Sequence, residues 1–131
     1  MQQGAPKKAV THYTNYSEKK NNPQIVESLI SAYLSLGDFY ERKRDIFTAA
    51  ISNSRFKILP SAGTYFQLLS YDSISEEKDT DFAVCLIKEY KIASIPVSVF
   101  YNIANDQKVL RFCFAKSEET LAQAAEIINK I

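Results

Sequence analysis

One arginine lies in an otherwise apolar stretch, Leu110-Arg-Phe-Cys-Phe-Ala-Lys116. Because alternate side chains of a β-strand point to opposite faces, the leucine and both phenylalanines share one face, and Arg111 shares the other with small side chains. A guanidinium carries five donors in a planar fork, which matches a carboxylate through two parallel hydrogen bonds. This pattern leaves open a surface arginine at a strand end, a structural ion pair and a cation for an anionic ligand. On the pattern alone, the ion pair is favoured over the ligand.

Two other groups of polar residues are candidates for chemistry. His12 is the only histidine, and no cysteine or carboxylate stands at metal-ligand spacing from it, which indicates a surface residue. An acidic cluster in the middle of the chain lacks the alternating ligands and central glycine of a calcium loop. We therefore expect a solvated loop there, followed by a helix that Asp79 caps. The cluster consists of Asp72, Glu76, Glu77, Asp79 and Asp81.

The two cysteines, Cys85 and Cys113, are far apart in the sequence, and each lies in an apolar run. Their spacing fits no metal pair, so both are expected to be small buried residues without a disulfide. We expect no metal site in the chain.

Composition restricts the class of protein. The chain has 131 residues, of which 46% are hydrophobic and 24% are charged, and this is typical of one soluble globular domain. Lysine and arginine number 16 against 15 acidic residues, so there is no basic excess for a nucleic-acid partner. No apolar run reaches the roughly 18 residues that span a bilayer, and the first residues lack the hydrophobic centre of a signal peptide. We expect a cytoplasmic protein with no nucleic-acid or membrane partner.

The elements that must position these residues can be predicted from periodicity. Residues 1–22 are polar and show no period, which favours an irregular segment. Apolar residues recur at helical spacing from Pro23, a residue suited to the first turn of a helix. Gly37 interrupts the pattern and Asp38 can cap a second run, so we expect a broken helix or two abutting helices that end near Asn53.

The rest of the chain mixes strands and helices. The runs 56–60 and 64–71 predict a hairpin or two neighbouring strands, and a helix is expected from Asp79 to about residue 91. The run 92–100 contains Pro96, so we expect an edge strand or a bend, and the run should leave the sheet after Ile95. A strand over 109–115 precedes a last helix capped by Ser117. The expected fold is α+β: a small, mainly antiparallel sheet of three to four strands with helices packed on one face.

Four ordered blocks resemble a known family. They are residues 33–45 (YLSLGDFYERKRD), 60–66 (PSAGTYF), 93–101 (ASIPVSVFY) and 110–116 (LRFCFAK). Their sequence is similar to the carboxy-terminal small domain of fold-type I (class I/II) aminotransferases that depend on pyridoxal phosphate, and in particular to the kynurenine, glutamine and methionine aminotransferases. The resemblance places this small domain at residues 23–131, after the irregular segment.

The resemblance implies a role for Arg111. In that family, the arginine of the last block grips the α-carboxylate of the amino-acid or 2-oxo-acid substrate. The lysine that forms a Schiff base with the cofactor, the acidic partner of the pyridinium nitrogen and the phosphate cup belong to the large domain, outside the matched blocks. We therefore expect no catalytic, cofactor-binding or metal-binding residue in this chain, and no transaminase activity from the chain alone.

Two other functions stay open. One is a stand-alone module that binds amino or oxo acids, or regulates by binding them, without catalysis. The other is an assembly surface without a ligand, which would associate with itself through the surface that faces the large domain in a complete enzyme.

Overall fold

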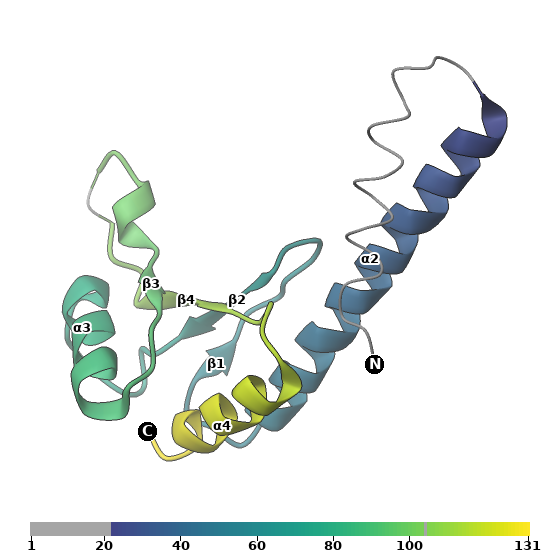
Figure 1. Ribbon diagram of the computed structural model, residues 1–131. Coiled ribbons are helices and arrows are strands. Elements are labelled where there is room, and N and C mark those ends of the chain that lie inside the picture. Colours follow the sequence, from purple (N-terminus) through teal and green to yellow (C-terminus); the bar gives the residue numbers. More distant parts are fainter. Residues whose placement is uncertain (1–21, 104) are drawn as a thin grey trace. The chain divides into compact units, whose positions relative to one another are not determined.

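The computed structural model describes residues 22–103 and 105–131 (Figure 1). His12 and all but the last residue of the expected irregular segment lie outside the described residues. Contacts within the chain divide it into two parts, Met1–Arg42 and Lys43–Ile131, and each is described by itself. Helices and strands follow one another in the predicted order.

The first helix, α2, covers Pro23–Ala50 without interruption. Its start agrees with prediction, because Asn22 Oδ1 accepts a hydrogen bond from the backbone N–H of Gln24 at 3.0 Å, directly before Pro23. The predicted break at Gly37 is wrong. A glycine inside a helix costs about 1 kcal/mol relative to alanine, and the straight-chain residues that follow it are good helix formers.

The sheet lies wholly within the part 43–131. It has four strands in the order β1-β2-β4-β3, and every neighbouring pair is antiparallel. The strands are β1 (Lys57–Ile58), β2 (Phe66–Ser70), β3 (Ile95–Pro96) and β4 (Val109–Cys113). The predicted hairpin of β1 and β2 and the edge position of Pro96 are confirmed. The chain leaves the sheet later than predicted, because Pro96 still pairs with Leu110 and Val97 N–H donates to the Val109 carbonyl at 3.3 Å.

The two faces of the sheet differ in burial, as the alternation in β4 predicts. Leu110, Phe112 and Phe114 are at most 4% exposed, as is Leu69 on β2. This face packs against α3 (Asp79–Tyr90) and α4 (Glu118–Ile128), whose own buried residues include Leu86 and Leu121. Arg111 lies on the opposite face, which is only half-buried. The predicted α+β fold with helices on one face is therefore confirmed.

The last helix forms as its sequence predicts. The Ser117 side chain accepts a hydrogen bond from the backbone N–H of Thr120 at 3.2 Å, which satisfies one of the free donors at the start of α4. Just before this cap, the Lys43 side chain donates to the Lys116 carbonyl at 2.7 Å. This bond ties the end of α2 to the start of α4.

An aromatic cluster joins the helices to the sheet. Tyr71, directly after β2, stacks on Phe82 of α3 with ring centroids 4.4 Å apart. Phe82 lies 6.4 Å from Phe56, which meets Phe112 of β4 edge-on at 6.0 Å. Such pairs contribute about 0.5–1.5 kcal/mol each beyond burial of their area.

Tyr71 makes the stability of this core depend on alkaline pH. Its hydroxyl donates to the Glu77 carbonyl at 2.9 Å. Burial, and then the nearby carboxylates of Asp106 and Asp79, raise the pKa of the hydroxyl above its ordinary value of 10.0. The stabilisation by neutral Tyr71 is complete below pH ~10 and is lost as the pH rises above it, because the unfolded chain then ionises more readily.

We expect the free energy of unfolding to fall when the pH is raised from 9 to 11. The fall should be smaller in Tyr71→Phe than in the unaltered chain. Urea unfolding at the two pH values measures the difference. Tyr101→Phe, which alters a tyrosine that is 47% exposed, is the control and should keep the full fall. Parallel curves for the unaltered chain and Tyr71→Phe would rule out a contribution from Tyr71.

Candidate anion-binding site

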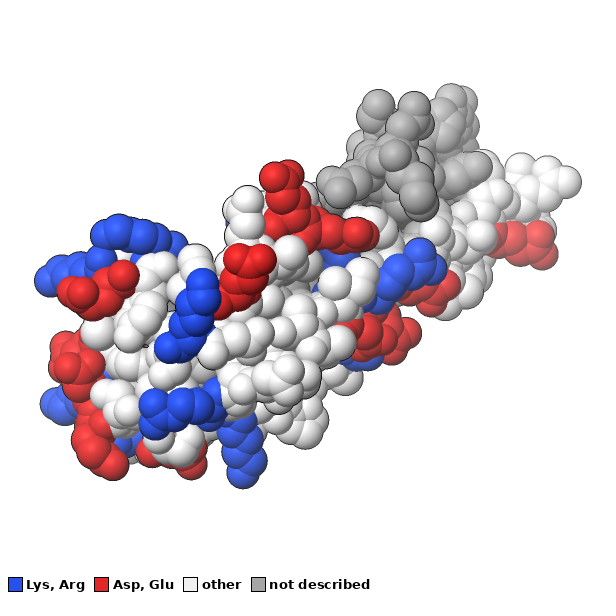
Figure 2. Space-filling view, turned by 90° about the horizontal axis from the view of Figure 1, so that it is seen from below, with Lys and Arg blue, Asp and Glu red and all other residues white. Residues whose placement is uncertain are grey.

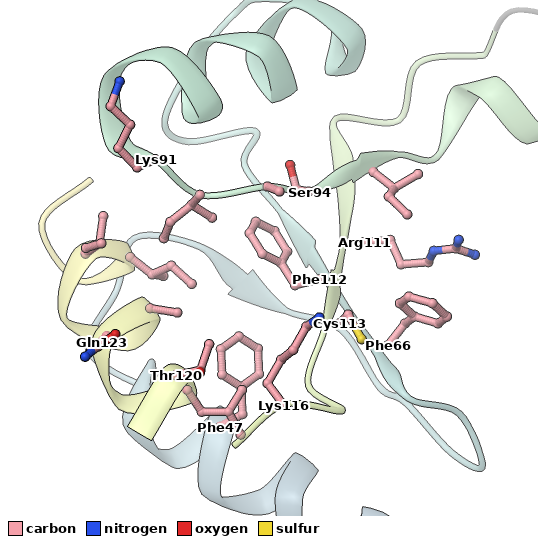
Figure 3. A pocket seen from close by; sticks show the side chains of 17 residues that line it. Phe47, Phe66, Lys91, Ser94, Arg111, Phe112, Cys113, Lys116, Thr120 and Gln123 are labelled. Carbon is pink, nitrogen blue, oxygen red and sulfur yellow. The ribbon is translucent and has the colours of Figure 1, made fainter. Parts of the chain in front are cut away.

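Arg111 projects from β4 on the side of the sheet away from the helices. In Figure 3 its guanidinium points in the direction opposite to Phe112 and α4. The guanidinium carbon lies 4.1 Å from the ring centroid of Phe66 on β2 and 4.7 Å from that of Phe100. Phe100 belongs to a short 3-10 helix, η1 (Ser98–Phe100), that follows β3. Both distances are within the range of cation–π attraction, so two rings hold the cation.

The guanidinium has no counter-charge among the described residues. Its Nε is buried and has no hydrogen-bond partner there, and the described residues form no ion pair with it. A buried donor without a partner costs about 1–3 kcal/mol, more for a charged group. The structural ion pair that the sequence pattern favours is therefore absent from the described part of the chain.

The surroundings of Arg111 differ from those expected. Cys113 and other small residues do share its face of β4, but the neighbours that contact the guanidinium are large rings. Strand pairing could have revealed Phe66, because Phe66 lies opposite Cys113 in the register and so beside Arg111. Phe100 had no such signal, since it lies in the 3-10 helix η1 and pairs with no strand.

A groove of about 430 Å³ runs beside Phe112 and Cys113 at the end of β4 (Figure 3). The segment 91–95 forms one wall and α4 forms the other, with Phe112 and Cys113 between them. Its charged lining residues are the cations Lys91, Arg111 and Lys116, and the lining contains no carboxylate.

The other candidates from the sequence do not assemble into a site. The described residues contain no cluster of histidine, cysteine or acidic side chains that could hold a metal ion. Cys85 and Cys113 are free, and they are half-buried rather than buried. In the acidic cluster, Glu76 pairs with Lys108.

The predicted cap by Asp79 is wrong. Helix α3 begins at Asp79 itself, and the residue before it makes no side-chain cap. The Asp79 carboxylate instead contacts Ser98, 19 residues further along the chain.

Charges of both signs are interspersed on the molecular face seen in Figure 2. The described residues there form no extended patch of one sign. No helix in the described ranges is both long enough and apolar enough to cross a bilayer.

Fold and site together define an α+β domain with an arginine on the open face of its sheet, beside two aromatic rings and without an ion-pair partner among the described residues. The model of the family "aminotransferase class I and II" matches residues 20–128. The chain therefore belongs to the class I and II aminotransferases. This confirms the resemblance carried by the four sequence blocks.

Individual relatives agree with this assignment. A methionine aminotransferase of Escherichia coli is 46% identical over 99 residues, which cover 76% of this chain and 26% of that protein. Kynurenine–oxoglutarate transaminase 3 of Bos taurus is 34% identical over 108 residues, which cover 72% of this chain and 24% of that protein. The chain thus spans about a quarter of the length of these relatives.

Solved structures show the same fold. A crystal structure of an Escherichia coli protein with a methionine aminotransferase function superposes with a TM-score of 0.74 at 44% identity, covering 77% of this chain and 26% of that one. N-succinyldiaminopimelate aminotransferase from Mycobacterium tuberculosis shares the fold with a TM-score of 0.64 at 23% identity. The superposition covers 88% of this chain and 28% of that one.

The family implies pyridoxal phosphate in a complete enzyme, where the cofactor acts as an electron sink for the amino-acid carbanion. The groove beside β4 does not match this cofactor. Its lining offers no carboxylate for the pyridinium nitrogen, and the Lys91 ammonium already donates to the Lys88 carbonyl at 2.6 Å.

Proposed function

We propose that this chain is the substrate-carboxylate-binding domain of an aminotransferase dependent on pyridoxal phosphate, with Arg111 as the residue that binds the carboxylate. The complete enzyme exchanges an amino group between an amino acid and a 2-oxo acid. One observation carries the proposal: the Arg111 guanidinium contacts two aromatic rings, and it has no ion-pair partner among the described residues.

The arrangement suits a carboxylate for a geometric reason. The guanidinium carbon lies over the rings of Phe66 and Phe100, and these two contacts restrict the movement of the cation. Two carboxylate oxygens match the N–H edge of a guanidinium through parallel charge-assisted hydrogen bonds. Because the rings fix the plane of the cation beforehand, less side-chain entropy is lost on binding.

The same region exposes apolar side chains, which supports a covering partner. Val99, Phe100 and Ile103 are 57%, 59% and 81% exposed. In the proposed enzyme this surface contacts the large domain. In the isolated chain it favours self-association, because an uncovered apolar surface seeks another.

A chimera tests the proposal. The matching segment of the Escherichia coli methionine aminotransferase is replaced by the corresponding residues of this chain. We expect the chimera to bind pyridoxal phosphate and to transaminate methionine, because the large domain supplies the cofactor site and this chain supplies the carboxylate site. The isolated 131-residue chain, measured in the same assay, should show no turnover.

A chimera that folds and binds the cofactor but gives no turnover would contradict the proposal. The alternative of a stand-alone binding module makes the opposite prediction for the isolated chain. Calorimetric titration of that chain with a 2-oxo acid should then show tight binding that Arg111→Ala removes.

A further inference from the structure

Phe100 is held over Arg111 without being buried. The residue is 59% exposed, and η1 contains no buried residue. A single turn of 3-10 helix is not stable by itself, because its hydrogen bonds are few and poorly aligned. Packing therefore does not explain why the ring stays 4.7 Å from the guanidinium carbon.

The first residue of η1 is bound by a buried carboxylate. Asp79 is 1% exposed, and its Oδ2 accepts from the backbone N–H of Ser98 at 2.8 Å. Its Oδ1 accepts from the Ser98 hydroxyl at 2.6 Å. Both carboxylate oxygens thus bind one residue, and that residue stands two positions before Phe100.

The start of α3 is in turn fixed to the approach to β4. The backbone N–H of Asp79 donates to Asp106 Oδ2 at 3.3 Å, and Asp106 Oδ1 accepts from the backbone N–H of Lys108 at 2.8 Å. Lys108 directly precedes the strand that carries Arg111. Asp79 therefore connects both sides of the contact, since one chain of bonds leads to Phe100 and the other to Arg111.

We infer that Asp79 is a positioning residue for the carboxylate site: through Ser98 it fixes η1, and so holds the Phe100 ring against Arg111. The inference rests on the proposed role of Arg111. Without the Asp79 bonds, η1 loses its two bonds at Ser98 and keeps the anchor just before it, where Val97 N–H donates to the Val109 carbonyl. The Phe100 ring is then held less firmly against the guanidinium, and the orientation of the cation is less fixed. A ligand would then have to order the arginine at the moment of binding.

The position of the ring can be measured without any ligand. A ring over a guanidinium shifts the nearby Nε–H proton resonance, so the Arg111 Nε–H signal of the ¹⁵N-labelled chain reports whether Phe100 is in place. Arg111→Lys identifies the signal by removing it. Phe100→Leu defines its position when the ring is absent.

We expect Asp79→Asn and Ser98→Ala to move the Arg111 signal at least halfway toward its position in Phe100→Leu. Ser98→Thr keeps a hydroxyl and should restore the original position. Asp81→Asn alters an exposed carboxylate in the same first turn of α3 and should leave the signal unmoved. An Arg111 signal that does not move in a folded Asp79→Asn chain overturns the inference.

Loss of folding can be separated from loss of positioning. If Asp79→Asn loses the dispersed spectrum of a folded chain, the test rests on Ser98→Ala. That variant removes only the hydroxyl bond and keeps the backbone N–H bond to Asp79, so it should remain folded. An unmoved signal in Ser98→Ala then overturns the inference.

The role of Arg111 itself is tested separately in the chimera, by comparing its KM for methionine with that of its Arg111→Ala variant. An NMR signal that moves in Asp79→Asn together with equal KM values for the chimera and Arg111→Ala supports the positioning role and counts against the carboxylate role. A KM that rises in Arg111→Ala together with a signal that does not move in Asp79→Asn has the opposite meaning.

Discussion

Arg111→Ala is expected to raise the KM of the chimera for its amino-acid substrate by about 100-fold. A charge-assisted hydrogen-bonded contact contributes about 1.5–3 kcal/mol, and each 1.4 kcal/mol corresponds to a factor of ten. The variant should raise KM more than it lowers kcat, because the arginine binds the carboxylate equally well in the ground state and in the transition state. Any fall in kcat would report the poorer orientation of the substrate. Initial rates over a range of amino-acid concentrations separate the two constants.

Two further variants make this test specific. Arg111→Lys keeps the charge but not the planar fork, so an intermediate KM is expected. Arg55→Ala removes an exposed arginine that donates to the carbonyls of Ser73 and Ile131, and it should leave KM unchanged. Equal KM values for the chimera and Arg111→Ala would end the case for a carboxylate site at this residue.

Phe82→Ala is expected to lower the free energy of unfolding by about 3–5 kcal/mol, a large share of the 5–15 kcal/mol typical of a domain. Phe82 is 4% exposed and contacts both Tyr71 and Phe56, so its removal leaves a cavity in the middle of the aromatic cluster. Urea unfolding followed by circular dichroism measures the change.

The matched control lies on the same helix. Val84 is 47% exposed, and Val84→Ala should change the free energy of unfolding by less than about 0.5 kcal/mol. A loss below about 1 kcal/mol for Phe82→Ala would mean that the cluster closes around the gap or is dispensable.

The parts of the fold that depend on local patterns could be predicted from the sequence. The alternation in β4 predicts both its buried face and the outward direction of Arg111, because a strand has a period of two. Ser117 predicts the start of α4 for an equally local reason, since its hydroxyl reaches a donor only three residues away. Gly37 misled the prediction, because the conformational cost of one glycine is small beside that of breaking a long helix.

The parts that depend on tertiary contacts could not be predicted. An aspartate at a helix start is usually a cap, and nothing local reveals that Asp79 binds Ser98 instead. The contact of Phe100 with Arg111 joins two segments through a turn and a bend, where no periodicity relates one side chain to another. The sequence therefore identified Arg111 as a candidate but did not predict the aromatic residues that contact it.

The order of the site residues along the chain affects how recombination would transfer the site. The two rings, the buried carboxylate, its serine partner and the arginine all lie on one uninterrupted stretch of the chain, from Phe66 to Arg111. A single segment of coding sequence thus encodes the cation together with its supports. Recombination with both breakpoints outside that segment transfers the arrangement whole, whereas a breakpoint between Ser98 and Arg111 separates the cation from the residues that orient it.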